Sequence, residues 1–283
     1  MSVQLQNISK RFGQVQALKK AGIVFEANRI YGLLGRNGAG KSTLLNILTN
    51  RIFPDEGTVL IDGENGLEND LAQSKLFLMS ETTLHPNFMR VNEAFRWAGA
   101  FYPGFQEDYA RKLAEEFALN PRSKISGLST GYRSIFKLIL ALSVNVPYLL
   151  LDEPVLGLDA NHRELFYRRL LEKYVESPLT VVLSTHLIEE VENLVEDVVI
   201  IKNGEILCQE SRESLLNRGY TVSGGAAAVE TYLQDKQVLS VEALGGLRTA
   251  YVLGSPEKQG ETAKDLEFGP VSLQKLFVQL TNS

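Results

Sequence analysis

Apolar and polar residues alternate near the start of the chain and then give way to short runs that are apolar throughout. Residues 3–8 and 22–26 have a period of two, which predicts half-buried antiparallel strands. Residues 30–34 form a nearly all-apolar run, which is typical of a strand buried on both faces. Three similar runs follow at residues 148–151, 180–184 and 198–201. Because helical patterns separate these runs, they predict a mostly parallel sheet in an α/β fold.

Between about residues 82 and 137 the pattern becomes helical. Residues 91–98 and 109–119 carry apolar side chains at three- and four-residue steps, which predicts amphipathic helices. A Pro-Gly pair and an Asn-Pro pair follow them as turn signals. We therefore expect a helical insert within the α/β region.

The C-terminal part of the chain returns to strand-like runs. Residues 237–244 and 247–253 are apolar and are joined by two glycines, which predicts a hairpin. Ser272 is a candidate N-cap for a short final helix with one apolar face, and the polar residues 256–264 predict a loop. Together these elements predict a small α+β domain over residues 211–283.

Composition limits the function only loosely. The chain of 283 residues is 44% hydrophobic and 22% charged, which is ordinary for a globular protein. Its net charge of −5 disfavours a nucleic-acid partner, which would usually meet a basic surface. The single Cys208 excludes an internal disulfide framework and fits a reducing cytoplasm. The apolar stretch 138–151 is shorter than the roughly 20 residues that cross a bilayer, so we expect any membrane part to come from another chain.

The run at residues 30–34 leads into a glycine-rich phosphate-binding pattern. Small residues let the backbone wrap around phosphates with its N–H groups pointing inward. The helix that follows adds the partial positive charge of its N-terminus. Lys41 can reach the β- and γ-phosphates, and the Ser42 hydroxyl can bind Mg²⁺. The candidate nucleotide-binding residues here are Gly35, Asn37, Gly38, Ala39, Gly40, Lys41, Ser42 and Thr43.

Two carboxylates, which we call the acidic pair (Asp152 and Glu153), follow the buried run at 148–151. They are expected at the carboxyl edge of the sheet, where ligands bind. There Asp152 would hold Mg²⁺ through its water shell, and Glu153 would orient and deprotonate the attacking water. A solvated turn is the usual meaning of such a pair, but the phosphate loop favours catalysis. His186 ends the run at 180–184 and is expected at the same edge, where it can donate a hydrogen bond to the γ-phosphate.

Two further motifs complete a resemblance to the nucleotide-binding subunits of ABC transporters. Residues 128–132, Leu-Ser-Thr-Gly-Tyr, resemble the signature motif of that family, and residues 157–159, Gly-Leu-Asp, resemble the loop that contacts the facing subunit. The resemblance covers residues 1–210. It implies an ABC ATPase cassette, with a P-loop α/β core, an antiparallel β subdomain and a helical insert, ahead of the small C-terminal domain.

The resemblance also implies a head-to-tail dimer around two ATP molecules. Ser129 and Gly131 would grip the γ-phosphate held by the opposite subunit, identical or different, so that a monomer hydrolyses ATP poorly. Phe12 lies where the family places an aromatic ring against adenine; an ordinary packed phenylalanine is the alternative. The chain departs from the family pattern at Thr130 and Tyr132, where a second Gly and a Gln are usual.

A third departure concerns the metal. The loop that links the nucleotide to transport usually carries Gln, and Glu81 occupies the aligned position. A carboxylate can bind Mg²⁺ directly or through water but cannot donate a hydrogen bond. The expected metal-binding residues are therefore Ser42, Glu81 and Asp152.

For the use of the ATP, the chain resembles ATPases of bacterial exporters of antimicrobial peptides, drugs or lipids. That likeness implies a cytoplasmic protein on the inner face of the cell membrane, bound to transmembrane permease subunits, with import as the nearest alternative. ABC-type ATPases that act on DNA or ribosomes are a different class, disfavoured by the absence of sustained heptads and of a second cassette. A simple P-loop kinase or GTPase would leave the signature motif and His186 unexplained.

Two regions have an expected role without an assigned chemistry. Residues 85–90, His-Pro-Asn-Phe-Met-Arg, are expected to dock a membrane subunit, with a core role as the alternative. Residues 211–283 are expected to be regulatory or to support the dimer, and a passive lid that only stabilises the fold is the alternative.

Overall fold

The computed structural model describes residues 1–82, 85–86, 88–257 and 265–282. The chain forms two compact units, of which the first contains residues 1–186 and 199–208, and the second contains residues 187–198 and 209–283. The boundary expected between residues 210 and 211 falls at the end of a strand. The inclusion of residues 187–198 in the second unit was not expected from the sequence.

A six-stranded sheet forms the centre of the first unit. Its order is β10-β9-β3-β8-β7-β6, and the pairs β3–β8, β8–β7 and β7–β6 are parallel. Every residue of β3, β7 and β8 is buried, as the all-apolar runs predicted. The strands are β3 (Ile30–Leu34), β6 (Leu76–Met79), β7 (Tyr148–Asp152), β8 (Thr180–Thr185), β9 (Asp197–Lys202) and β10 (Glu205–Ser211).

A separate antiparallel sheet has the order β2-β1-β4-β5. Its apolar face belongs to one core cluster with helix α1 (Lys41–Leu48) and the central sheet, in which Leu5, Phe25, Leu44 and Val199 are all buried. The strands are β1 (Ser2–Phe12), β2 (Val15–Glu26), β4 (Glu56–Ile61) and β5 (Glu64–Asn65). The first two are longer than predicted, because bulges interrupt their alternation.

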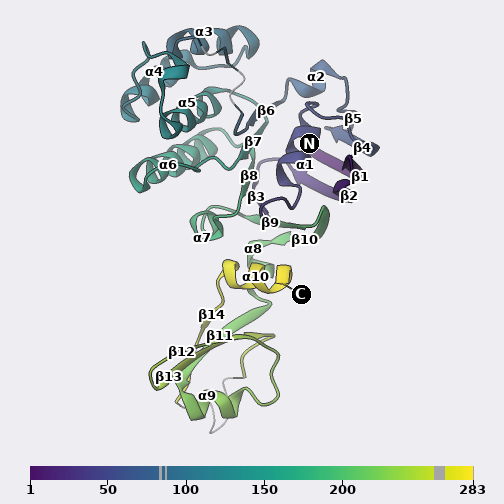
Figure 1. Ribbon diagram of the computed structural model, residues 1–283, viewed down its shortest axis with the longest axis vertical. Coiled ribbons are helices and arrows are strands. Elements are labelled where there is room, and N and C mark those ends of the chain that lie inside the picture. Colours follow the sequence, from purple (N-terminus) through teal and green to yellow (C-terminus); the bar gives the residue numbers. More distant parts are fainter. Residues whose placement is uncertain (83–84, 87, 258–264, 283) are drawn as a thin grey trace. The chain divides into compact units, whose positions relative to one another are not determined.

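The helical insert is confirmed, and its last helix reaches Ser143 rather than residue 137. In Figure 1 this insert and the helix after β7 lie on one side of the central sheet, and α1 lies on the other. The helices of this side are α3 (Val91–Phe101), α4 (Glu107–Glu116), α5 (Thr130–Ser143) and α6 (Ala160–Glu176). Helix α2 (Asp70–Gln73) is a short turn before β6. Residues 83, 84 and 87 of the insert lie outside the described residues.

The second unit has its own antiparallel sheet, ordered β12-β13-β11-β14, and a small core that includes Tyr220, Val222 and Val252. The predicted hairpin is confirmed by the pairing of β12 with β13. Helix α10 begins after Ser272, as predicted, and contacts α7 and α8. The elements are α7 (Ile188–Val191), α8 (Arg212–Leu216), β11 (Gly219–Gly225), α9 (Ala226–Tyr232), β12 (Val238–Leu244), β13 (Leu247–Leu253), β14 (Glu267–Pro270) and α10 (Leu273–Asn282).

Of the loop predicted at residues 256–264, residues 258–264 are outside the described part. Within that part, none of the helices combines the length and the hydropathy that crossing a bilayer requires.

Candidate active site

The phosphate loop (residues 35–40) joins β3 to α1 and is closely packed. Gly40 has a φ of 113°, and a Cβ atom there would lie 2.7 Å from the carbonyl oxygen of Ala17. A Cβ on Gly35 would lie 2.7 Å from the carbonyl oxygen of Ile201. Both positions therefore require glycine, the first also because of its left-handed backbone. No described side chain caps the N-terminus of α1, which leaves its first N–H groups to a phosphate.

Lys41 is the first residue of α1 and is almost fully buried, with 6% of its side chain exposed. Its Nζ donates a hydrogen bond to the carbonyl oxygen of Gly35 at 2.8 Å. The same atom lies 3.5 Å from Oε1 of Glu153. The ammonium thus lies between the phosphate loop and the acidic pair, while Ser42 next to it is exposed.

The acidic pair is held by the end of the neighbouring strand β8. Asp152 is buried, and its Oδ1 accepts a hydrogen bond from Oγ of Ser184 at 2.8 Å. The backbone N–H of Glu153 donates to the carbonyl oxygen of Ser184 at 2.8 Å. Glu153 has a φ of 47°, in the left-handed region that non-glycine residues seldom adopt. The backbone is therefore held in an uncommon conformation at the second of the two carboxylates.

Glu153 has three partners that together neutralise and orient its carboxylate. Besides Lys41, the Thr185 hydroxyl donates to Oε2 at 3.2 Å, and Nδ1 of His186 lies 3.0 Å from both oxygens. Because an ionised carboxylate only accepts, Nδ1 of His186 carries the proton of this bond. A hydrogen bond from Nε2 to a γ-phosphate therefore has one of two requirements. Either the ring is doubly protonated, or His186 gives up its bond to Glu153 and carries its single proton on Nε2 instead.

Glu81 lines a cavity of about 460 Å³ together with both members of the acidic pair. Residues of α5, including Arg133, form the facing wall. The structure thus places the three carboxylates of the expected site along one cavity. The sequence did not lead us to expect that Ser184 and Thr185 hold the acidic pair. The pattern that could have indicated it is a pair of hydroxyl residues at the end of a buried strand, directly before His186.

The signature residues lie at the start of α5 and are more open. Ser129 is exposed and caps the helix, since its Oγ accepts a hydrogen bond from the N–H of Tyr132 at 3.3 Å. A Cβ atom on Gly131 would lie 3.1 Å from the carbonyl oxygen of Gly157, so the two expected contact loops pack closely. Within the described residues, no hydrogen bond or ion pair joins either signature residue to Lys41 or Glu153. Their role toward a facing subunit stays a prediction.

Phe12 ends β1 with 47% of its surface exposed. Nζ of Lys10 lies 5.6 Å from the centre of its ring. This exposure disfavours the alternative of an ordinary packed phenylalanine. The ring is accessible for stacking, and its use for adenine stays a prediction.

The donor set fits a nucleotide with its metal. The phosphate loop supplies backbone N–H groups, Lys41 a cation, and Ser42 and Asp152 the oxygen ligands that Mg²⁺ prefers. Among the described residues, no group of three His, Cys, Asp or Glu side chains forms a metal cage. Mg²⁺ in nucleotide sites usually keeps phosphate oxygens and water among its ligands, so it does not need a cage made by the protein alone.

Comparison with known proteins agrees with this geometry. The family model described as "ABC transporter" matches residues 18–156. "ABC transporter ATP-binding protein YtrB" of Bacillus subtilis is 23% identical over 98% of this chain and 97% of its own length. "Probable sulfate/thiosulfate import ATP-binding protein CysA" of Chlorella vulgaris is 31% identical over 76% of this chain and 93% of its own. "Nod factor export ATP-binding protein I" of Burkholderia lata is 28% identical over 99% of this chain and 96% of its own length.

Solved structures show the same fold. One solved structure, of the ATP-binding subunit of an ABC transporter, matches 76% of this chain and 92% of its own chain. The TM-score is 0.68 and the sequence identity is 22%. A dimeric cassette, MJ0796, bound to ADP and Pi in a post-hydrolysis state, matches 74% and 98% with a TM-score of 0.66 and 25% identity.

The chain therefore belongs to the family of ABC transporter ATP-binding proteins. It is the ATP-binding subunit of an ABC transporter, an enzyme that binds ATP with Mg²⁺ and hydrolyses it. Membership implies that it acts with another cassette and with membrane subunits. The relatives include importers and exporters, so the family alone leaves the direction of transport open.

Proposed function

We propose that this protein powers the export of a peptide, drug or lipid across the cell membrane. The Nod factor export protein supports this proposal, since its similarity extends over 99% of the chain and so includes the C-terminal unit. The sulfate/thiosulfate import protein has the higher identity but aligns with only 76%. Import is the second candidate, because an arabinose import ATP-binding protein of Rhizobium johnstonii also aligns with 92% of the chain.

Each proposed ATP site is shared between two subunits placed head to tail. The observation that carries this proposal is the contrast between Glu153, paired with Lys41 and His186, and the exposed Ser129 at a helix N-terminus. One subunit holds the phosphates with its loop and positions water with Glu153. The other presents Ser129 and Gly131 to the γ-phosphate, where the helix N-terminus favours negative charge.

When ATP binds, its phosphates compete with Glu153 for the ammonium of Lys41. The carboxylate then keeps Thr185 and His186 as partners, and its free lone pairs accept the proton of the attacking water. Mg²⁺ would be held by Ser42, Asp152 and Glu81, the last directly or through water, and Phe12 would stack on the adenine ring.

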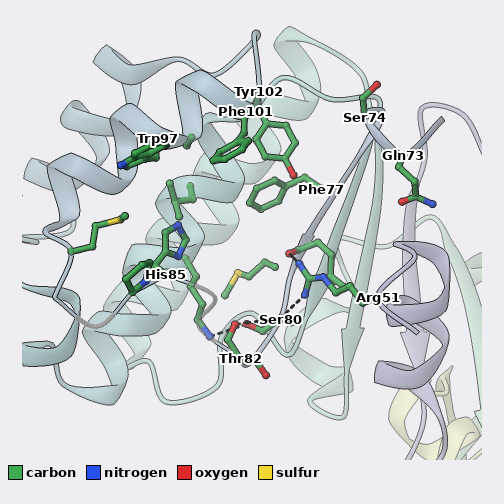
Figure 2. Close-up of a pocket in the computed structure, with 17 residues that line it drawn as sticks. Arg51, Gln73, Ser74, Phe77, Ser80, Thr82, His85, Trp97, Phe101 and Tyr102 are labelled. Atoms are coloured by element: carbon green, nitrogen blue, oxygen red, sulfur yellow. Dashed lines mark hydrogen bonds between the residues drawn. The ribbon is translucent and has the colours of Figure 1, made fainter. Parts of the chain in front are cut away.

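A cavity of about 670 Å³, which we call the aromatic groove, is the proposed docking site for a membrane subunit. Figure 2 shows Trp97, Phe101, Tyr102 and Phe77 along one side of it and Arg51 with Ser80 on the other. Its described lining is mostly apolar, contains no carboxylate and includes two cationic side chains, those of Arg51 and Lys137. An amphipathic helix with an acidic residue matches that combination.

The expected docking segment 85–90 borders this groove. His85, Pro86 and Met89 line it, Phe88 is 77% exposed, and Asn87 lies outside the described residues. The ring of His85 packs edge-on against the ring of Phe136, with the ring centres 5.1 Å apart. Burial lowers the pKa of His85, which favours the neutral imidazole. Docking there would hold the protein on the inner face of the membrane, with no nucleic-acid partner.

Direction of transport is tested by a gene deletion with two complementing alleles. Export predicts that the deletion strain becomes sensitive to members of a panel of antimicrobial peptides, drugs or lipid-directed agents, and that wild type but not Glu153→Gln restores resistance. Inverted membrane vesicles should then take up the identified compound only with ATP. Loss of growth on a nutrient, without any gain in sensitivity, would instead support import.

A further inference from the structure

Helix α5 carries one lysine in the middle of an apolar stretch. Residues 135, 136 and 138–142 are all buried, and Lys137 among them is half-buried. Its Nζ donates to the carbonyl oxygens of Ser80 at 2.9 Å and Glu81 at 2.7 Å. Burial lowers the pKa of Lys137, and the nearby carboxylates of Glu81 and Asp152 oppose that shift. In the described part of the chain no carboxylate lies within ion-pair distance of this ammonium, so two backbone carbonyls are its direct partners.

These carbonyls belong to the turn at residues 80–81, which directly follows β6. Beyond Met79 this segment has no strand neighbour in the described structure, and side chains hold it instead. On the α1 side, Arg51 donates to Oγ of Ser80 at 2.9 Å and to the carbonyl oxygen of Leu78 at 3.1 Å, as Figure 2 shows for Ser80. Lys137 holds the same turn from α5. The turn is therefore fixed between the helix that follows the phosphate loop and the helix that begins at the signature motif.

Lys137 also lies between two cavities. It lines the aromatic groove and, on its other side, the smaller cavity that contains Glu81 and the acidic pair. Three carboxylates, those of Glu81 and the acidic pair, line that smaller cavity. Like charges disfavour a Glu81 side chain that faces the acidic pair, and a fixed backbone limits the positions that this side chain can take. An ammonium on the carbonyl of Glu81 itself both fixes the backbone and offsets part of the negative charge.

We propose that Lys137 is a positioning residue for ATP hydrolysis, which fixes the turn at residues 80–81 so that Glu81 faces the acidic pair. This inference rests on the metal-binding role proposed above for Glu81. It assigns to α5 a second task besides presenting the signature motif. A displacement of α5 then carries the Glu81 turn with it, because the two are joined by two charge-assisted hydrogen bonds.

The test compares Lys137→Met with Lys173→Met in the full-length protein. Lys173 on α6 is a matched control: it is also half-buried, burial also lowers its pKa, and its Nζ donates to the carbonyl oxygen of Val144 at 2.8 Å. It lines a different cavity, formed with Pro147 and Thr180 at the start of β7 and β8. Both variants should lower the melting temperature similarly, since each leaves a buried carbonyl without its donor.

Only Lys137→Met is expected to lower kcat, by about 10–100-fold, with a higher Mg²⁺ concentration for half-maximal activity and little change in ATP affinity. Lys137→Arg should recover part of the loss. Glu81→Ala, which removes the ligand oxygen, should also lower kcat, and combining it with Lys137→Met should add little, because both act through the position of the Glu81 side chain. An equal kcat for Lys137→Met and Lys173→Met, with Glu81→Ala impaired, would overturn the role of Lys137 alone. A fully active Glu81→Ala would instead remove the metal role of Glu81, and this inference with it.

Discussion

The two halves of the candidate active site differ in how many partners their side chains find within this chain. On the phosphate-loop side, Glu153 is only 10% exposed and is in contact with Lys41, Thr185 and His186. On the signature side, Ser129 is exposed, and among the described residues its hydroxyl bonds to the start of its own helix. In the proposed mechanism, the first half must exchange partners when a phosphate enters, whereas the second meets its phosphate on the facing subunit. Rearrangement and assembly would then be two separable requirements for turnover.

The largest expected effect comes from removing the acceptor in the first half. Glu153→Gln keeps the size of the side chain but cannot take a proton, so kcat should fall about 10²–10⁴-fold while Mg·ATP still binds. Size-exclusion chromatography with ATP should show a trapped dimer. Glu205→Gln is the control, since Glu205 pairs with Lys19 at the surface. A Glu153→Gln protein with full activity would exclude Glu153 as the base.

The second effect separates the two halves directly. Lys41→Ala should lose nucleotide affinity, whereas Ser129→Ala should bind ATP normally and lose turnover about 10²–10³-fold, as expected when one donor to a developing charge is removed. Mixing the two variants should restore part of the activity, because one of the two shared sites in a mixed dimer is intact. If mixed dimers form and no activity returns, the head-to-tail arrangement is wrong.

A smaller effect on ATPase activity is expected at the docking segment 85–90, which borders the aromatic groove. Phe88→Asp places a charge on a side chain that is 77% exposed, so it should abolish transport in membrane vesicles and leave basal hydrolysis unchanged. Val175→Asp on α6 is matched in exposure, at 77%, and lies outside the docking segment, so it should transport normally. Unimpaired transport by Phe88→Asp would contradict docking at this surface.

The smallest effect on ATP hydrolysis is expected from truncation of the chain after Ser211. This change removes the sheet of the second unit and α10, whose backbone at Leu273 donates to Oε1 of Glu192 beside α7 at 3.1 Å. A regulatory role predicts near-normal ATP affinity with altered turnover or altered dependence on protein concentration. Glu192→Ala, which removes the acceptor of that hydrogen bond, should shift turnover in the same direction but less. If both variants changed only the melting temperature, the passive-lid alternative would hold.

The sequence predicted the parts of the fold that repeat a local rule. Buried parallel strands, the C-terminal hairpin and the helical insert all follow from periodicity, and the structure has them. The short strands β4 and β5 were missed because they carry little alternation. The place of residues 187–198 in the second unit was missed for a different reason: it depends on α10 packing against α7, a contact between segments far apart in the chain.

The site shows the same division. The phosphate loop could be identified because its glycines and lysine act at fixed spacing within one turn. The partners of Glu153 could be guessed only by assuming which strands are neighbours, and Thr185 was overlooked. The tie from Lys137 to the carbonyl of Glu81 joins positions 56 apart in sequence. No local pattern marks it except a charge within an apolar helix.

The left-handed backbone at Glu153 has a consequence for how this position would change under selection. A non-glycine residue in that conformation costs roughly 1–3 kcal/mol, and Gly or Asn tolerates it better. A library of variants at this position, screened for thermal survival alone, should therefore be enriched in Gly and Asn and depleted of hydrolytic activity. If Glu153 is the catalytic base, selection for hydrolysis favours glutamate at this position, whereas selection for folding stability favours Gly or Asn. The two properties would then have opposite preferences at one residue.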